Sequence, residues 1–412
     1  MPEVLSSAAA AAAGAETQAG DCGRLLGLFE LVPDPRRARG IRHQLPGVLA
    51  VAAAAVLAGC RSVLAIAEWA AEAPQPVLAA LGARRDRRAG CWRAPGEDTF
   101  RRVLGAVDAA AVDQVIGIFL TEHAGPGAPG RGWRHQQDPA GPEEAGPAGR
   151  RPALAVDGKT VRGARQRDGR PLHLLAAMPH DVPAALAQRE VGHKTNEITQ
   201  VKPLLEHLEL AGRVVTLDAL HCQKDTARYL AGDRGAGYLF TAVKDNQRGL
   251  LRRLTALPWA QAPPGHTSRD RGHGRQETRT IQALPAPAGL FPHAAQAFMI
   301  QRQVHDLSGT LISAATSAGI TSLPPAAAGP ERLAGYVRGH WAIENQLHWV
   351  RDTAFGEDHA QLRKGSAPQV LAGLRNLAIG ALHAAGRPNI AASLRWISRN
   401  PLRVLHILGE PP

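Results

Sequence analysis

The chain has 412 residues, of which 44% are hydrophobic, so it is long enough for two or three domains with buried cores. Its formal net charge of +12 favours polyanionic partners, nucleic acid first, although a basic protein that binds no polyanion is the plain alternative. The four cysteines contain no CxxC pair, which excludes a zinc ribbon or a disulfide framework and fits a reducing cytoplasm.

The N-terminal residues 1–21 are alanine-rich and lack the basic start of a signal peptide, and we expect them to be disordered. Residues 22–122 have apolar residues at helical spacing and predict a small all-helical domain that either binds DNA or serves in packing or dimerisation. The candidate N-caps are Ser62, Asp98 or Thr99, and Asp108. The apolar run 45–60 is too short and too rich in alanine to predict a membrane span.

Residues 123–150 are rich in glycine and proline and predict a linker. From residue 151 to residue 412 the pattern changes to alternating strands and helices, which predicts an α/β domain with a mixed sheet. A mostly β insertion, at about 245–335, interrupts this domain, and helices follow it. The expected strands lie at 153–157, 172–178, 184–191, 212–218 and 236–243, and those of the insertion at 276–284, 295–304 and 309–320.

Two aspartates stand where an apolar strand ends. Asp157 follows "ALAV" and Asp218 follows "VVTL". Either one alone is better explained as a turn or helix-capping residue. Because ligands gather at strand ends in α/β sheets, two such aspartates in one sheet favour a shared site.

The stretch "RGHWAIENQLHWVRD", residues 338–352, predicts a helix that carries Glu344 between two histidines. His340 and His348 lie eight residues apart, about 12 Å along a helix, so both cannot bind a metal that Glu344 binds. A zinc site on this helix alone is therefore improbable, and hydrogen-bonding or DNA-contacting roles suit the histidines better. Glu344 instead predicts a third carboxylate beside the two aspartates, a donor set that suits Mg²⁺.

Seven ordered segments resemble the ISAs-one group, the H-repeat-associated insertion-sequence transposases. The segments are "VDGKTVRGAR", "HLLAAM", "KTNEI", "VVTLDALHCQ", "AVKDNQ", "HGRQETRT" and "RGHWAIENQLHWVRDTAFGEDHAQLR". The resemblance runs from about residue 22 to the C-terminus. It implies an RNase H-like catalytic core with a β insertion before the catalytic glutamate.

The resemblance also implies a catalytic and metal-binding triad of Asp157, Asp218 and Glu344, which would hold two Mg²⁺ ions that Mn²⁺ can replace, with Asp157 bridging them. Related transposases carry a tyrosine and an arginine before the glutamate and a basic residue seven after it, places that Tyr336, Arg338 and Arg351 roughly occupy. The spacing between Arg338 and Glu344 departs from the commoner pattern, and Arg351 replaces the usual lysine. The expected DNA contacts are Lys159, Arg162, Lys194, Lys244, Arg275, Tyr336, Arg338, His340, Trp341, His348 and Arg351, each of which is otherwise a solvated or packed side chain.

The implied function is transposition. The protein would bind double-stranded DNA at the terminal inverted repeats of its element, cut it, and transfer the freed 3′-hydroxyl to target DNA. We expect a homodimer, since two ends must meet, and a location in the bacterial cytoplasm at the nucleoid, without a membrane partner. Two alternatives remain: an inactive or domesticated copy that only binds DNA, and an RNase H-like nuclease without strand transfer.

Overall fold

The computed structural model describes residues 22–124, 150–165, 169–192, 195–263, 265–272, 274–360 and 362–409. The expected disorder of residues 1–21 and most of the expected linker 123–150 lie outside this described part.

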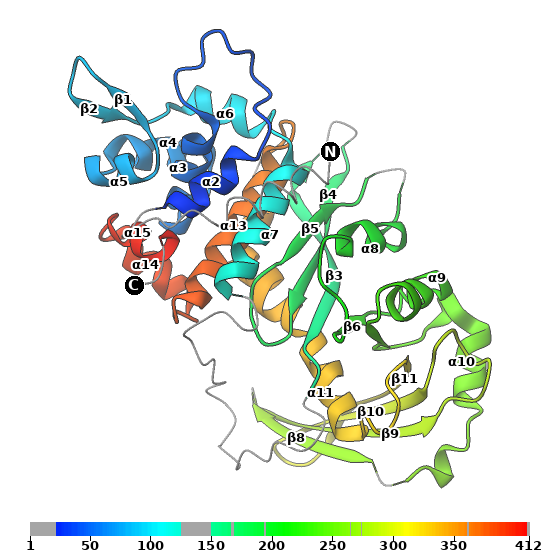
Figure 1. Cartoon of the computed structure of the whole chain (residues 1–412). Helices are drawn as coiled ribbons and strands as arrows, with labels where there is room; N and C mark the ends of the chain where they lie inside the picture. The colour runs from blue at the N-terminus through cyan, green and yellow to red at the C-terminus, as the bar shows by residue number, and fades with distance from the viewer. Residues whose placement is uncertain are drawn as a thin grey trace.

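The N-terminal part is a helical bundle with one small hairpin (Figure 1). Its helices are α2 (Gly23–Glu30), α3 (Leu45–Leu57), α4 (Val63–Glu72), α5 (Gln75–Ala80), α6 (Glu97–Leu104) and α7 (Ala109–Ala124). Ser62 caps α4 by accepting a hydrogen bond from Ala65 N–H, and Asp108 accepts one from Ala110 N–H, as predicted. Gly96, and neither Asp98 nor Thr99, stands at the N-cap of α6.

The prediction that this part is all-helical is wrong in one detail. Strands β1 (Arg84–Asp86) and β2 (Cys91–Arg93) pair antiparallel between α5 and α6. Short strands of mostly charged residues lack the alternation of apolar residues that would have predicted them.

The rest of the chain is a mixed α/β unit built on a nine-stranded sheet of order β5-β4-β3-β6-β7-β11-β10-β9-β8. The first five strands in chain order are β3 (Ala153–Arg165), β4 (Pro171–Pro179), β5 (Ala187–Glu190), β6 (Val214–Leu217) and β7 (Gly237–Phe240). β3, β4 and β5 are antiparallel neighbours, whereas β3, β6 and β7 run parallel. β3 runs eight residues past Asp157, so the strand that we expected to end there continues.

The predicted β insertion lengthens this sheet at its β7 edge. Its strands are β8 (His266–Gly272), β9 (Arg275–Pro285), β10 (Gln296–Asp306) and β11 (Leu311–Thr321), and β8 alone was not predicted. Only Ile320 and Thr321, the last residues of β11, pair with β7. Because β11 is antiparallel to β7, most of β11 and the strands beside it extend past the carboxyl end of β7, where the two predicted aspartates lie. We name these four strands the β arm.

Helices cover both faces of the sheet. α8 (Glu197–Leu205), α9 (Lys224–Arg228) and α10 (Arg248–Thr255) follow β5, β6 and β7 in the chain, and α8 contacts β4 and β5. α11 (Pro330–His340) packs across β3 and β6 through a cluster that includes Leu333 and Tyr336. The chain then continues through α12 (Trp349–Thr353), α13 (Ala367–Ala384), α14 (Ile390–Ser398) and α15 (Arg403–Leu408).

The helical part and the α/β unit share one hydrophobic core. α7 and α13 lie side by side although about 250 residues separate them (Figure 1), and α13 also packs against α3. One buried cluster runs from α2 and α3 through α13 into β3, β4 and β6. The helical part is therefore held rigidly against the sheet, since interdigitated cores resist sliding.

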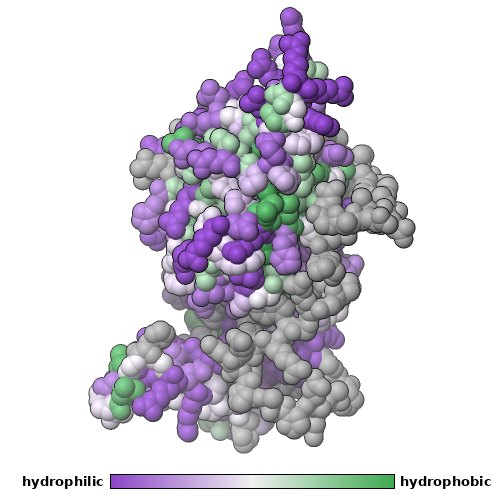
Figure 2. All heavy atoms as spheres, turned by 90° about the vertical axis from the view of Figure 1, so that its left-hand side faces the viewer, coloured by the Kyte–Doolittle hydropathy of each residue, from purple (hydrophilic) through white to green (hydrophobic). Residues whose placement is uncertain are grey.

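The outer face of the helical part is mostly hydrophilic, with hydrophobic residues in small patches (Figure 2). The alanine-rich helix α3 is buried almost along its whole length. Among the described residues no single helix is long and apolar enough to cross a bilayer, and only α6 and α7 taken together, with a 94° bend between them, reach that length and composition.

Candidate active site

Asp157 and Asp218 lie next to each other at the same edge of the sheet. Val156 of β3 pairs with Leu217 of β6 in the parallel register, so the residue after each is an aspartate. Neighbouring strands are about 4.8 Å apart, which places the two carboxylates on adjacent strands of one layer. Asp218 Oδ1 accepts hydrogen bonds from the N–H groups of Leu220 and His221, at 2.9 and 3.3 Å.

Glu344 reaches this edge from a π-helical turn and not from the continuous α-helix that the sequence predicts. α11 ends at His340, residues Glu344–His348 form the π turn, and α12 begins at Trp349. A π turn inserts an extra residue into an α-helix and is frequent at functional sites, because it turns side chains away from the regular helical spacing.

His348 completes the cluster that Glu344 forms with Asp157. The Nδ1 atom of His348 lies 3.1 Å from Glu344 Oε2 and 3.6 Å from Asp157 Oδ2. One ligand atom from each of these three residues lies within 4.8 Å of the other two. His340 takes no part, because its Nδ1 lies 3.2 Å from Thr216 Oγ1 in the core. His340 therefore lies apart from the cluster of Asp157, Glu344 and His348.

The site concentrates negative charge around Asp157. Burial raises the pKa of Asp157 to about 7, and the charges of Asp218, Glu344 and Glu197 act in the same direction against a hydrogen bond from Gly158 N–H. A hydrogen bond from His348 lowers the pKa of Glu344. Carboxylates crowded together at a half-buried edge repel one another, and a divalent cation between them would relieve that repulsion.

The residues present fit a hard divalent cation. Asp157, Glu344 and Asp218 offer carboxylate oxygens, the ligands that Mg²⁺ and Mn²⁺ prefer, and all three side chains have access to solvent. The cluster has a single imidazole and no thiolate, whereas structural zinc sites use cysteine and histidine.

Comparison with known proteins assigns the chain that carries this site to a family. Residues 148–380 match the family model described as "Transposase DDE domain", and residues 26–120 match the model described as "DDE_Tnp_1-associated". The first model covers more than half of the 412 residues. The chain belongs to the DDE transposase family. Membership implies use of a divalent metal, in agreement with the donor set.

Individual relatives agree with this assignment. The chain is 26% identical to the "H repeat-associated putative transposase YhhI" of Escherichia coli strain K12, over 87% of this chain and 90% of that protein. YbfL of the same strain is 27% identical over the same shares. The predicted resemblance to H-repeat-associated transposases is therefore confirmed. The cryo-EM structure of a piggyBac transposase synaptic complex with hairpin DNA aligns over 96% of this chain and 83% of that chain, with a TM-score of 0.43 and 12% identity.

A fourth carboxylate of this DDE transposase, Glu197, lies under the site and was not predicted. His173 Nε2 lies 2.7 Å from its Oε1 and His221 Nε2 lies 3.2 Å from its Oε2. Although burial opposes ionisation, the hydrogen bonds from the two histidines lower the pKa of Glu197 to about 2. The "KTNEI" motif contains Glu197, but a glutamate just after the cap Asn196 is typical of any helix start and gave no signal of a buried role.

Glu197 lies on the face of β3 that carries Gly158, opposite the side chain of Asp157, because alternate strand residues point to opposite faces. Lys159, two residues after Asp157, contacts Asp352 of α12. Gly158 instead faces Glu197: a Cβ at this position would lie 2.6 Å from Glu197 Oε2. Glu197, held by His173 and His221, therefore packs against the β3 backbone next to Asp157.

The helix that follows Glu344 is fixed by buried ion pairs. Arg351 and Arg375 both bind the fully buried Glu357, at 2.8 Å. Arg351 also donates to Gln188 of β5 at 3.1 Å. Gln188 in turn donates to Asp113 of α7, at 3.0 Å, so that polar contacts connect the active-site helix to the N-terminal helices. A buried network of this kind defines one orientation of α12.

Four of the predicted DNA contacts have buried side chains, which argues against direct contact with DNA in this structure. Arg351 is 0%, Tyr336 1% and His340 3% exposed. Arg351 is used in the ion pairs of α12, and Tyr336 donates its hydroxyl to Arg151 O at 3.0 Å. His348 is also buried, beside the carboxylates. The sequence showed their spacing but not that these positions face the core.

The remaining DNA-contact predictions differ in exposure. Lys159 is nearly buried and its Nζ lies 2.6 Å from Asp352 Oδ2, so its charge is already neutralised. Lys194 lies outside the described residues. The side chains that reach solvent, and that stay predicted contacts, are Arg162, Lys244, Arg275, Arg338 and Trp341.

Proposed function

We propose that this protein cuts the DNA ends of its own insertion sequence and joins them to target DNA. Water would attack the phosphorus at the element end, and the bond from phosphorus to the 3′-oxygen would break to leave a free 3′-hydroxyl. That hydroxyl would then attack a target phosphodiester in line, forming a new P–O bond as the target's 3′-oxygen leaves. The convergence of Asp157, Asp218 and Glu344 at one sheet edge, from segments 187 residues apart, carries this proposal.

An RNase H-like core supports the proposal as the scaffold. Three antiparallel strands, β5, β4 and β3, are followed in the sheet by the parallel strands β6 and β7. The first two carboxylates directly follow the last paired residues of the parallel strands β3 and β6, and the third comes from a π turn that follows the β arm. The boundaries 22–122 and 151–412, with an insertion at about 245–335, remain part of this proposal.

The three carboxylates would act together as metal ligands in the proposed reaction. Asp157, whose pKa the charges of Asp218 and Glu344 both raise, would hold the Mg²⁺ ions together with these two carboxylates. Such ions polarise the phosphodiester and stabilise the attacking and leaving oxygens, and Mn²⁺ should replace Mg²⁺. His348 holds the Glu344 carboxylate toward Asp157 through its Nδ1 contact.

The surface around the site suits double-stranded DNA. Arg162 is exposed five residues along β3 from Asp157. Arg275 lies at the outer end of the β arm, opposite Asp306 in the strand register, and Trp341 is 58% exposed just before the π turn. Arginines track phosphates and an exposed indole stacks on bases. We also propose a homodimer, since two ends must be joined in one complex, and a location at the nucleoid.

The decisive experiment is cleavage of a duplex that carries the terminal inverted repeat of the element encoding this chain, with Mg²⁺ or Mn²⁺. Asp157→Asn, Asp218→Asn and Glu344→Gln should each abolish strand cleavage while DNA binding persists. Asp225→Asn is the matched control, because Asp225 is an exposed carboxylate paired with Arg228 at 2.8 Å, outside the cluster. Cleavage by any triad variant at the rate of the parent would contradict the assignment.

The same assay separates the alternatives. A DNA-binding protein without activity would bind the repeat but leave it intact in parent and variants alike. A nuclease without strand transfer would cut the repeat but produce no joined product with a target plasmid. The β arm favours transposition, since cutting alone does not require an extended arm beside the site.

A further inference from the structure

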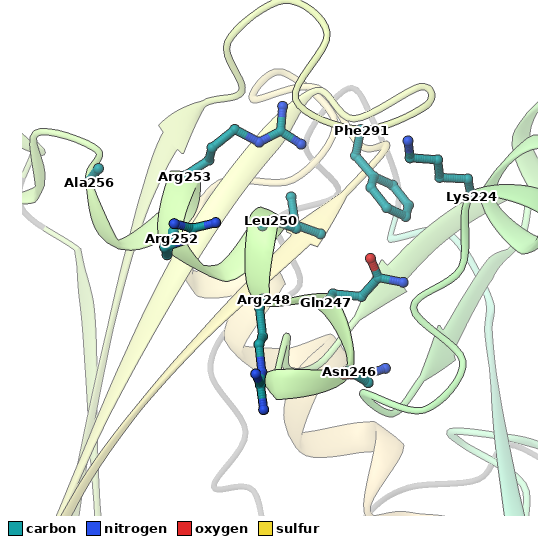
Figure 3. Close-up of a pocket in the computed structure, with 10 residues that line it drawn as sticks. Lys224, Asn246, Gln247, Arg248, Leu250, Arg252, Arg253, Ala256 and Phe291 are labelled. Carbon is teal, nitrogen blue, oxygen red and sulfur yellow. The ribbon is translucent and has the colours of Figure 1, made fainter.

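A cavity lined by basic residues lies beside the sheet edge that carries the candidate carboxylates. It is a cavity of about 780 Å³ formed by the start of α9, the turn before α10, α10 itself, and the loop that carries Phe291 (Figure 3). The lining residues that carry a polar side chain are Lys224, Asn246, Gln247, Arg248, Arg252 and Arg253. Four of these are cations and none is a carboxylate, so we name this cavity the basic pocket.

Of the four cations of the basic pocket, one holds a neighbouring loop and three have side chains free to bind a ligand. Arg253 donates to the carbonyl oxygens of Gly289 and Leu290, at 3.3 and 2.7 Å, and thereby holds the loop with Phe291 against α10. Lys224, Arg248 and Arg252 are exposed, and within the described part of the chain none has a side-chain hydrogen bond or an ion pair. Unpaired cations gathered around one cavity attract a polyanion.

Hydrogen bonds connect the basic pocket to the Asp218 loop. Asn246 Nδ2 donates to Ala219 O, the residue directly after Asp218, at 2.7 Å. Gln247 Nε2 donates to Gln223 Oε1 at 3.3 Å, in the turn before Lys224. The pocket therefore lies along the same edge of the sheet as the carboxylates, past β6 and β7. At about 4.8 Å per strand, its centre is on the order of 10–20 Å from Asp157, or roughly three to six base pairs of DNA.

We propose that the basic pocket binds the phosphates of duplex DNA on one side of the phosphodiester that is cut. This inference rests on the proposed function and adds the direction in which the DNA runs, from the carboxylates across β6 and β7 to α10. Arginine guanidinium groups bind phosphate oxygens with two parallel hydrogen bonds. A side chain on one phosphate fixes the register of the duplex, which sets the phosphodiester that meets Asp157.

The test removes two charges from the basic pocket and compares the result with an equal change elsewhere. Arg248→Gln/Arg252→Gln acts at two exposed positions four residues apart at α10. The control Arg395→Gln/Arg399→Gln acts at two exposed positions with the same spacing at α14, which packs against α13. The probe is a labelled duplex carrying the terminal repeat, titrated at several salt concentrations.

The pocket variant should bind this duplex about tenfold more weakly than the parent, and the slope of log affinity against log salt should fall by about 2, one for each lost phosphate contact. The control should keep the slope of the parent. Shortening the duplex to about two base pairs on one side of the cut should remove the difference between parent and pocket variant for that side only. Equal slopes for parent, pocket variant and control would overturn the inference.

A second measurement does not depend on lost affinity. A Cβ added at Gly249, which lines the pocket, meets no atom within 4 Å, so Gly249→Cys accepts a tethered iron chelate once Cys60 and Cys91 are replaced by serine. The chelate should cut bound DNA several base pairs to one side of the transposase cut. Cuts absent or scattered over the duplex would contradict the pocket. If the parent cleaves the repeat and these results fail, the proposed function stands and the inference alone is wrong.

Discussion

The Nδ1 atom of His348 lies 3.1 Å from Glu344 Oε2, although the two residues are separated by a π turn and not by an α-helical one. Burial lowers the pKa of His348, so the neutral imidazole is favoured and a single N–H points to the carboxylate. This contact fixes Glu344 in the orientation in which it faces Asp157. Removing the imidazole is therefore the most direct test of how Glu344 is held in the site.

Replacing His348 by alanine should weaken Mn²⁺ binding and slow cleavage by about 10–100-fold, the usual effect of losing a residue that orients a metal ligand. Mn²⁺ affinity can be measured by electron paramagnetic resonance, independently of activity. His359→Ala is the control, because His359 is exposed on the following turn and its side chain is not in the cluster. Unchanged Mn²⁺ affinity in His348→Ala would show that Glu344 does not depend on the imidazole.

Asp113 should make the protein less stable as the pH rises. Burial raises the pKa of this α7 carboxyl to about 7 from its ordinary 3.8, against hydrogen bonds from Gln369 and Gln188. Between these two values the unfolded chain releases a proton that the folded protein keeps, so the free energy of unfolding falls with rising pH. Below the lower value and above the higher one this contribution is constant.

Asp113→Asn should remove that dependence. From about pH 5 to pH 8 the parent should lose about 2–3 kcal/mol relative to the variant, from two pKa units of 1.36 kcal/mol each. Urea unfolding at several pH values measures the difference, and Asp225→Asn provides an exposed carboxylate for comparison. Parallel pH profiles of the unfolding free energy for parent and Asp113→Asn would contradict the raised pKa of Asp113.

Arg351→Met should destabilise the protein by about 3–5 kcal/mol, because it leaves Glu357 buried with one cationic partner in place of two. Glu357→Gln should cost at least as much, since it leaves two buried arginines without their anion. Arg162→Ala, on an exposed side chain, should change stability by less than about 0.5 kcal/mol. Equal losses in Arg351→Met and Arg162→Ala, measured by urea unfolding, would contradict the buried network.

Gly158→Ala should be tolerated better when Glu197 is also shortened. The added Cβ would lie 2.6 Å from Glu197 Oε2, and two histidines prevent that carboxylate from moving aside freely. We expect a cost of about 1–3 kcal/mol in the parent and a clearly smaller one in a Glu197→Ala background. Gly272→Ala, at the end of strand β8, where the Cβ meets no atom within 4 Å, is the matched control. The same cost in both backgrounds would exclude the contact.

The sequence by itself determined most elements and the identity of the three candidate carboxylates. Apolar runs that end in Asp157 and Asp218 are local signals, because a buried strand requires hydrophobic residues and a carboxylate after it marks a polar edge. Helix caps such as Ser62 and Asp108 are local as well. The spacing of His340 and His348 was enough to reject a site made by one helix, since helix rise is fixed.

Only the tertiary structure decided which side chains reach the surface and which residues meet across the chain. Arg351 and Tyr336 resemble DNA contacts in the sequence, but their helices turn them into the core, a choice made by packing against α13 and β3. The π turn at Glu344 and the support of Gly158 by Glu197 depend on contacts between segments far apart in the chain. Such contacts leave no periodic pattern in the sequence, because each is specified by the fold as a whole and not by its neighbours along the chain.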